Sequence, residues 1–281
     1  MPSHDISPLS RVVDRVDQLR DGGADPGIVP TGLVTLDRAI GGGLRRGELI
    51  VLGGDDRVGC SSLALAMALR MQTRALLLTS EMHAERAYER ALAMSACVSL
   101  ESLRLGVVTE DERLRLAAEA VTLRDHAPII DSLGGGGVAD VVQAVRAGPP
   151  PAVVIIDGLE ALLEGAGAHF TARDEALAFA VLSVKRLALA SNAAVLLLCH
   201  LPDLDRSRQD KRPRLTDFGV RGAIGTHADV VLGLYREELY DSDLGVAGAT
   251  ELRVLKHRDG DLAYVDLFFY AHWLRFEEVG V

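Results

Sequence analysis

The sequence of 281 residues has few cysteines, and none of its apolar runs approaches the roughly 20 residues needed to span a bilayer. The three cysteines, Cys60, Cys97 and Cys199, lie far apart, which excludes a disulfide framework and a paired-cysteine metal site. The first residues lack the basic stretch and the apolar stretch of a secretory signal. We therefore expect a cytoplasmic protein with no membrane partner.

Lysine and aromatic side chains are also scarce. Lys185, Lys211 and Lys256 are the lysines among 30 basic residues, and aromatic residues make up 4% of the chain. The formal net charge of −10 argues against nucleic-acid binding through bulk charge, and few aromatic rings are available to stack on bases. Binding of single-stranded DNA would therefore depend on backbone contacts and on a local group of basic residues, such as one lining the channel of a ring.

Hydrophobic residues, by contrast, make up 48% of the chain, enough for the core of one large α/β domain. Strand-like runs alternate with helical stretches at Glu48–Gly53, Ala75–Thr79, Pro128–Asp131, Ala152–Asp157 and Ala193–Cys199. Three later runs lie closer together and are expected to be antiparallel: Asp229–Tyr235, Glu251–Lys256 and Leu262–Phe269. The pattern predicts a RecA-like α/β fold, a mostly parallel twisted sheet flanked by helices with antiparallel strands at its C-terminal edge.

The N-terminal segment, residues 1–22, is expected to form a separate amphipathic helix. Ser7 and Pro8 are typical of a helix start. Apolar residues then recur at helical spacing: Leu9, Val12, Val13, Val16 and Leu19. Residues 23–30, rich in glycine, proline and aspartate, predict a flexible linker before a main domain at residues 31–281. The apolar face of the helix needs a partner, either its own domain or a neighbouring subunit.

The stretch from Gly54 to Ser61, with the sequence GDDRVGCS, lies between a strand-like run and a helical one. This is the setting of a P-loop, G-x-x-x-x-G-K-[ST], which holds phosphates with backbone N–H groups, a lysine charge and a Mg²⁺-binding hydroxyl. Cys60 stands where the motif has lysine, and Arg57 could act as a substitute cation. The candidate nucleotide-binding residues are Gly54, Arg57, Gly59, Cys60, Ser61 and Ser62.

Two acids lie at the carboxyl ends of strand-like runs. Asp157 can hold a Mg²⁺-bound water beside the hydroxyl of Ser61. Glu81 can orient or deprotonate an attacking water. Either acid could instead cap a helix, and composition does not separate the two interpretations.

Basic residues gather at two further places. The loop at residues 205–214 could contact nucleic-acid phosphates, or it could be an ordinary solvated loop. Its candidate residues are Arg206, Arg208, Lys211, Arg212 and Arg214. Lys256 and Arg258 close a late strand and could reach a neighbouring subunit's nucleotide as an arginine finger, or they could be surface charges.

Several ordered motifs resemble those of the C-terminal motor domain of DnaB-type replicative DNA helicases, of superfamily 4. The segment Thr31–Ile50 would equally suit the RadA and KaiC families. The discriminating segments are Thr79–Met82 (family S-L-E-M), Asp210–Pro213, Tyr235–Tyr240 (Y-R-[DE]-E-x-Y), Lys256–Gly260 (K-x-R-x-G) and Trp273–Phe276. The resemblance extends from about residue 11 to residue 278.

The resemblance implies a hexameric ring that hydrolyses ATP with Mg²⁺ on single-stranded DNA. It implies that Ser61 and Asp157 bind Mg²⁺ and that Glu81 is the catalytic base. Lys256 and Arg258 would act on the adjacent subunit's γ-phosphate. His200 stands where the family has a glutamine that links DNA contact to the γ-phosphate. The N-terminal helix resembles the family's linker helix, which docks on a neighbouring subunit.

The sequence also departs from the family pattern. Cys60 replaces the lysine, Asp55 and Asp56 add negative charge to the loop, and Gly219 replaces an arginine. The family's primase-binding N-terminal domain has no counterpart here. Three hypotheses follow. The first is an ATP-driven helicase of DNA replication with a weakened nucleotide site. The second is a degenerate RecA-like ring or adaptor that regulates or scaffolds an intact replicative helicase. The third, a RadA- or KaiC-like ATPase, fits the first part of the chain alone.

Overall fold

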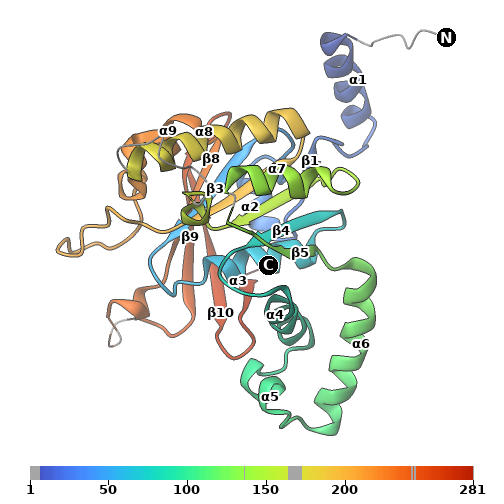
Figure 1. Ribbon diagram of the computed structural model, residues 1–281, viewed down its shortest axis with the longest axis vertical. Coiled ribbons are helices and arrows are strands. Elements are labelled where there is room, and N and C mark those ends of the chain that lie inside the picture. The colour runs from blue at the N-terminus through green and yellow to red at the C-terminus, as the bar shows by residue number, and fades with distance from the viewer. Residues whose placement is uncertain (1–6, 136, 164–172, 242, 244, 281) are drawn as a thin grey trace.

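The structure, a computed structural model, describes residues 7–135, 137–163, 173–241, 243 and 245–280 (Figure 1). Its strands are β1 (Ile28–Val29), β2 (Leu44–Arg45), β3 (Leu49–Gly54), β4 (Ala75–Thr79), β5 (Ile129–Ser132), β6 (Val153–Asp157), β7 (Ala194–Cys199), β8 (Val230–Tyr235), β9 (Ala249–His257), β10 (Ala263–Tyr270) and β11 (Arg275–Glu278). Within these residues, nine strands form one sheet in the order β11-β10-β9-β8-β3-β7-β6-β4-β5.

The sheet is parallel from β8 to β5 and antiparallel from β8 to β11. The predicted α/β fold, with antiparallel strands at the C-terminal edge, is therefore confirmed. All eight predicted strands are present with small shifts at their ends. Two features were not predicted. The short strand β11 pairs with β10, and Ile28–Val29 pairs with β2 inside the stretch that we expected to be a linker. Both segments are too short to show a period in the sequence.

Helices cover both faces of the sheet (Figure 1). One face packs against α2 (Val34–Ala39), α3 (Cys60–Arg70) and α4 (Ala84–Ala96), and the other against α7 (Val138–Arg146), α8 (Arg173–Ser191) and α9 (Ala223–His227). In β3, Ile50 and Leu52 face the first core, whereas Leu49 and Val51 face the second. Because both faces are buried, the strand reads as a continuous apolar run.

Two further helices, α5 (Leu100–Leu105) and α6 (Glu110–His126), pack beside α4 at the lower end of Figure 1. A capping box begins α6, since Thr109 and Glu112 exchange hydrogen bonds. Short 3-10 turns are η1 (Leu159–Leu163), η3 (Leu215–Phe218), η4 (Val220–Gly222) and η5 (Glu237–Leu239). No helix in the described part of the chain is both long and apolar enough to cross a membrane.

The N-terminal helix α1 (Pro8–Arg20) stands away from the body of the domain in Figure 1. It begins as predicted, with Ser7 accepting a hydrogen bond from the backbone N–H of Ser10 and with proline in the first turn. Its apolar side chains are exposed by 43% to 73%: Leu9, Val12, Val13, Val16 and Leu19. This face therefore has no cover within the described residues.

Candidate functional site

The predicted strand–loop–helix between β3 and α3 forms the base of the site. Gly59, at a φ of 109°, is the N-cap of α3 and offers no side-chain cap to the first turn. A Cβ on Gly59 would lie 2.9 Å from Phe276, and one on Gly54 would lie 2.4 Å from Val58. The loop thus requires glycine at both positions. The uncapped N–H groups of the first turn are suited to bind an anion.

A cavity of about 670 Å³ lies over this loop, at the edge where the parallel strands end. Its volume is within the range of small-molecule sites. It is lined by all the predicted nucleotide-binding residues and by the predicted acids and histidine: Gly54, Arg57, Gly59, Cys60, Ser61, Ser62, Glu81, Asp157 and His200. The structure therefore brings together residues that are up to 146 positions apart in the sequence, since Gly54 and His200 line one cavity.

Ser61 and Asp157 are in direct contact inside the cavity. The Oγ of Ser61 donates to Oδ1 of Asp157 over 3.2 Å, and Asp157 is 8% exposed. Burial raises the pKa of Asp157 to about 6, helped by the charge of Glu81 and opposed by the Ser61 hydrogen bond. A hydroxyl and a carboxylate are hard oxygen donors, and a divalent cation would compensate the buried charge. The pair therefore fits a Mg²⁺ ion.

We expect Asp157→Asn to stabilise the protein at pH 7.5 in the absence of Mg²⁺ and nucleotide. Because the pKa of Asp157 is higher in the folded state, its contribution to stability is full below the ordinary pKa of 3.8 and is lost as the pH rises through about 6. A shift of about two pKa units corresponds to about 3 kcal/mol, so a gain of about 1–3 kcal/mol is expected. Asparagine can still accept from Ser61.

Urea denaturation at pH 4 and pH 7.5 measures this gain, which should disappear at pH 4. Asp111→Asn on the exposed side of α6 is the control, because its carboxylate has an exposed partner, Arg115, and should change little at either pH. Equal destabilisation of Asp157→Asn at both pH values would contradict the expected cost of the buried charge.

Glu81 lies on the cavity wall, two residues after β4. Its backbone N–H donates to the Oγ1 of Thr79 over 3.1 Å. Glu81 does not cap the next helix, because α4 begins after His83 and has no side-chain cap. The carboxylate is instead near enough to Asp157 to raise its pKa. A base in this position can act on a water in the cavity.

Both acids of the P-loop have side-chain partners. Asp55 accepts two hydrogen bonds from Arg206, at 2.7 and 3.0 Å, and one from the hydroxyl of Tyr240 at 3.0 Å. Burial alone would raise the pKa of Asp55, but these bonds and one from the N–H of Asp56 bring it below its ordinary value. Asp56 lies 3.2 Å from Nδ1 of His200. The loop is thereby tied to the basic loop and to the end of β7.

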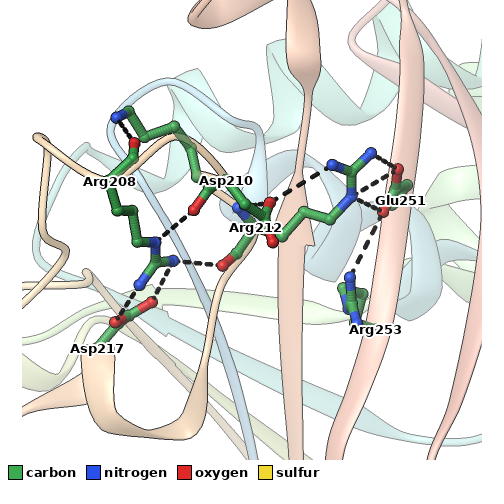
Figure 2. Close-up of polar contacts among 7 residues, drawn as sticks. Arg208, Asp210, Arg212, Asp217, Glu251 and Arg253 are labelled. Atoms are coloured by element: carbon green, nitrogen blue, oxygen red, sulfur yellow. Dashed lines mark hydrogen bonds and ion pairs between the residues drawn. The ribbon is translucent and has the colours of Figure 1, made fainter.

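Figure 2 shows how the basic loop at residues 205–214 is held. Arg208 makes two 2.8 Å hydrogen bonds to Asp217, which is 3% exposed. Arg212 binds both carboxylate oxygens of Glu251 on β9 and lies over the ring of Tyr235. These two arginines fix the shape of the loop.

The other basic residues of the loop differ in exposure. Arg206 and Arg214 are exposed at the surface, although Arg206 also binds Asp55. Lys211 is partly buried and donates to backbone carbonyls within the loop. The five candidates therefore divide into inner residues, Arg208, Lys211 and Arg212, and exposed residues, Arg206 and Arg214, of which Arg206 also binds the P-loop.

The cavity lies at the carboxyl end of β8, whereas Lys256 and Arg258 lie near its amino end, on the opposite side of the domain. In the β8–β9 pair, Tyr235 at the cavity edge is opposite Glu251, whereas Val230 is opposite His257. At about 3.3 Å per residue, the two ends of β8 are about 17 Å apart. Arg258 binds Asp229 at 3.0 Å, and burial with repulsion from Arg258 lowers the pKa of Lys256. Neither residue lines the cavity of its own chain.

Four arginines of the cavity wall were not predicted: Arg86, Arg90, Arg104 and Arg236. Arg86 and Arg90 are spaced by one helical turn on α4, immediately after Glu81, and this spacing could have indicated that both face the site. Arg236 directly follows β8 at the cavity edge. Arg104 comes from α5, whose position no local pattern predicts.

Residues 28–278 match the family described as the DnaB-like helicase C terminal domain. Among curated relatives, the chain is 27% identical over 275 residues to the replicative DNA helicase DnaC of Bacillus subtilis (strain 168) and 26% identical to the replicative DNA helicase DnaB of Geobacillus stearothermophilus. Each match covers 95% of this chain but 60% of the relative. The chain thus spans less than two thirds of these relatives' length.

Solved structures give the same result for the fold. One is described as a DnaB-like replicative helicase and its interactions with primase; it has a TM-score of 0.83, is 26% identical, and the match covers 97% of this chain and 67% of that one. A second, described as an ATPase domain, has a TM-score of 0.86 at 24% identity, and the match covers 98% of this chain and 99% of that one. The second likeness supports the fold alone.

Proposed function

This chain belongs to the family of DnaB-like helicase C-terminal domains, and we propose on that premise that it binds ATP with Mg²⁺ and couples ATP hydrolysis to movement on single-stranded DNA. The observation that carries the proposal is the cavity over the P-loop. It combines an uncapped helix N-terminus, the Ser61–Asp157 pair and Glu81. This is the donor set and the base that phosphoryl transfer to water requires.

The proposed roles follow from the geometry. The N–H groups at the start of α3 bind phosphate oxygens, and Ser61 with Asp157 holds Mg²⁺, which neutralises charge on the phosphates. Glu81 takes the proton of the attacking water. We propose that His200, whose Nδ1 lies 3.2 Å from Asp56 of the P-loop, links nucleotide binding to DNA contact. This role corresponds to the coupling glutamine of the family.

Action in trans is the role that we propose for Lys256 and Arg258. Both residues lie about 17 Å along the sheet from their own cavity edge, so a nucleotide that they contact must belong to another copy. A second copy stacked with this edge against the first copy's cavity would bring two cations to the γ-phosphate. Repetition of this contact gives a ring, which we propose to be a hexamer as the family resemblance implies.

Deletion of residues 1–22 is expected to shift the protein to smaller assemblies, because the apolar face of α1 has no cover in its own chain and we propose that it docks on a neighbouring subunit. Light scattering across a range of protein concentrations measures the mass. Val16→Asp should weaken assembly in the same direction, whereas Asp14→Ser, on the same helix but outside the apolar set, is the matched control. An unchanged mass after the deletion would count against this role.

We propose that the basic loop binds single-stranded DNA. We propose that the exposed Arg206 and Arg214 contact phosphates, while Arg208, Lys211 and Arg212 hold the loop in place. Replicative relatives and the primase interaction named for one solved structure make DNA replication the proposed setting, with an intact helicase as the proposed partner.

The deciding experiment is ATP turnover by the purified protein with and without a single-stranded oligonucleotide. The proposal expects turnover that the oligonucleotide stimulates and that an equal amount of duplex stimulates less. The second candidate, a regulatory or scaffolding ring, is favoured by the neutral Cys60 in the P-loop. It expects a ring that binds an intact helicase but has no turnover of its own. ATP turnover that is unchanged by DNA would contradict both candidate functions.

A further inference from the structure

Position 60 leaves the phosphate end of the cavity without its usual cation. Cys60 is the first residue of α3, and a cysteine side chain carries no positive charge. The same cavity contains Glu81, Asp157 and Glu160, which repel phosphates. Bound ATP therefore needs a positive charge from another part of the chain.

Arg90 lies beside the residues that would hold the phosphates. It is on α4, flanked by Ala87 and Ala91, which are 4% and 0% exposed. These small side chains allow the helix to pack closely on the core. Arg90 lines the main cavity and also a recess of about 20 Å³ that it shares with Ser61, Ser62 and Asp157. Arg90 is thus next to the first turn of α3.

The Nε of Arg90 is buried and has no hydrogen-bond partner among the described residues. A buried donor without a partner is costly, and the cost is recovered when an acceptor arrives. Asp157 and Glu81 attract the charge of Arg90 without binding this nitrogen. The group is therefore held near the phosphate position with a donor still to be satisfied.

The other arginines of the cavity are less well placed. Arg104 is 3.1 Å from Glu89, and Arg236 binds Glu238 and lies over the ring of Phe269. Arg57 and Arg86 have exposed side chains. None of these four lines the recess beside Ser61, so among the described arginines Arg90 is the one that does.

We propose that Arg90 supplies the phosphate-facing charge that position 60 lacks, with its guanidinium bound to the β- and γ-phosphate oxygens of ATP. The inference rests on the proposed function, because it assumes that the cavity binds a nucleoside triphosphate. A cation on α4 would thus replace the lysine that is missing at the start of α3 in the same chain. The planar guanidinium with several donors suits phosphate oxygens.

The test is a double-mutant cycle on nucleotide binding. The dissociation constant of a fluorescent ATP analogue is measured with Mg²⁺ at fixed salt for the unaltered chain, Cys60→Lys, Arg90→Gln and the double variant. Arg90→Gln should weaken binding by about 10- to 100-fold in the unaltered chain, the range for one lost charge-assisted contact. In the Cys60→Lys background it should weaken binding by about threefold or less, because the new lysine takes over.

Further measurements separate phosphate binding from structural support. AMP, which lacks the β- and γ-phosphates, should bind equally with and without Arg90→Gln. Arg90→Lys should retain most of the affinity for ATP. Arg113→Gln, on the neighbouring α6 and outside the cavity, should change nothing. Arg57→Gln and Arg86→Gln should each cost much less than Arg90→Gln.

Each contrary result has its own meaning. Equal losses from Arg90→Gln in both backgrounds would overturn compensation, because Arg90 would then act independently of position 60. A parallel loss of AMP binding would assign Arg90 a structural role, and a larger loss from Arg57→Gln would assign the charge to the P-loop itself. No binding by either the unaltered chain or Cys60→Lys would overturn the proposed function and this inference with it. Binding that is insensitive to Arg90→Gln would overturn the inference alone.

Discussion

We expect Glu81→Gln to lower the proposed DNA-stimulated ATP turnover by about a hundredfold or more while leaving ATP affinity nearly unchanged. Glutamine keeps the size of the side chain but cannot accept the proton of the attacking water, and a positioned general base contributes about 10²–10⁴-fold to a rate. Loss of the negative charge beside Asp157 should not weaken the binding of phosphates. The effect therefore belongs to turnover rather than to binding.

Steady-state turnover and equilibrium binding, measured on the same preparation, separate these two quantities. Glu85→Gln is the matched control, because it makes the same chemical change in the first turn of α4 without lining the cavity. It should leave both quantities unchanged. If Glu81→Gln retained full turnover, the carboxylate would have no part in proton transfer.

Asp217→Ala will lower the free energy of unfolding by about 3–5 kcal/mol. The carboxylate is 3% exposed and accepts two hydrogen bonds from Arg208 and one from the backbone N–H of Arg214. Removing one partner of such a buried pair leaves an uncompensated charge, which is the costly case for an ion pair. The basic loop should lose its shape at the same time, so affinity for single-stranded DNA should also fall.

Asp210→Ala is the control within the same loop (Figure 2). Its carboxylate is half exposed, and its partner Arg212 keeps its bonds to both carboxylate oxygens of Glu251, so a loss of about 1 kcal/mol or less is expected. Urea denaturation gives both values. Similar losses from the two substitutions would show that Asp217 is not the anchor of the loop.

The sequence was sufficient to predict the strands and the residues at their ends. Buried parallel strands are continuous apolar runs, so β3, β4, β6 and β7 were visible without any structure. The residues that line the cavity follow from these strands, because the carboxyl ends of parallel strands meet at one edge. That is why Ser61, Glu81 and Asp157 could be grouped in advance.

The side-chain partners within the site could not be predicted in the same way. The Asp55–Arg206 contact joins residues 151 positions apart. From the sequence, Asp55 is an unfavourable negative charge in a phosphate-binding loop. In the structure its carboxylate accepts two hydrogen bonds from the guanidinium of Arg206. Arg208 and Arg212 likewise read as free charges until their acids, Asp217 and Glu251, are seen beside them. Such pairing depends on how loops fold over the sheet edge, for which no periodic pattern exists.

The antiparallel course of β9 has a kinetic consequence. It leaves each chain with the phosphate cavity on one edge and Lys256 and Arg258 on the other, so the proposed contact is head-to-tail rather than two-fold symmetric. Each catalytic site of the proposed ring is then formed by two molecules. The specific activity therefore depends on how many interfaces between subunits are formed. Turnover per molecule should rise steeply with concentration until rings close. In rings mixed with Arg258→Ala subunits, ATP turnover should fall by more than the fraction of variant subunits. This result is expected when hydrolysis proceeds sequentially from one subunit interface to the next.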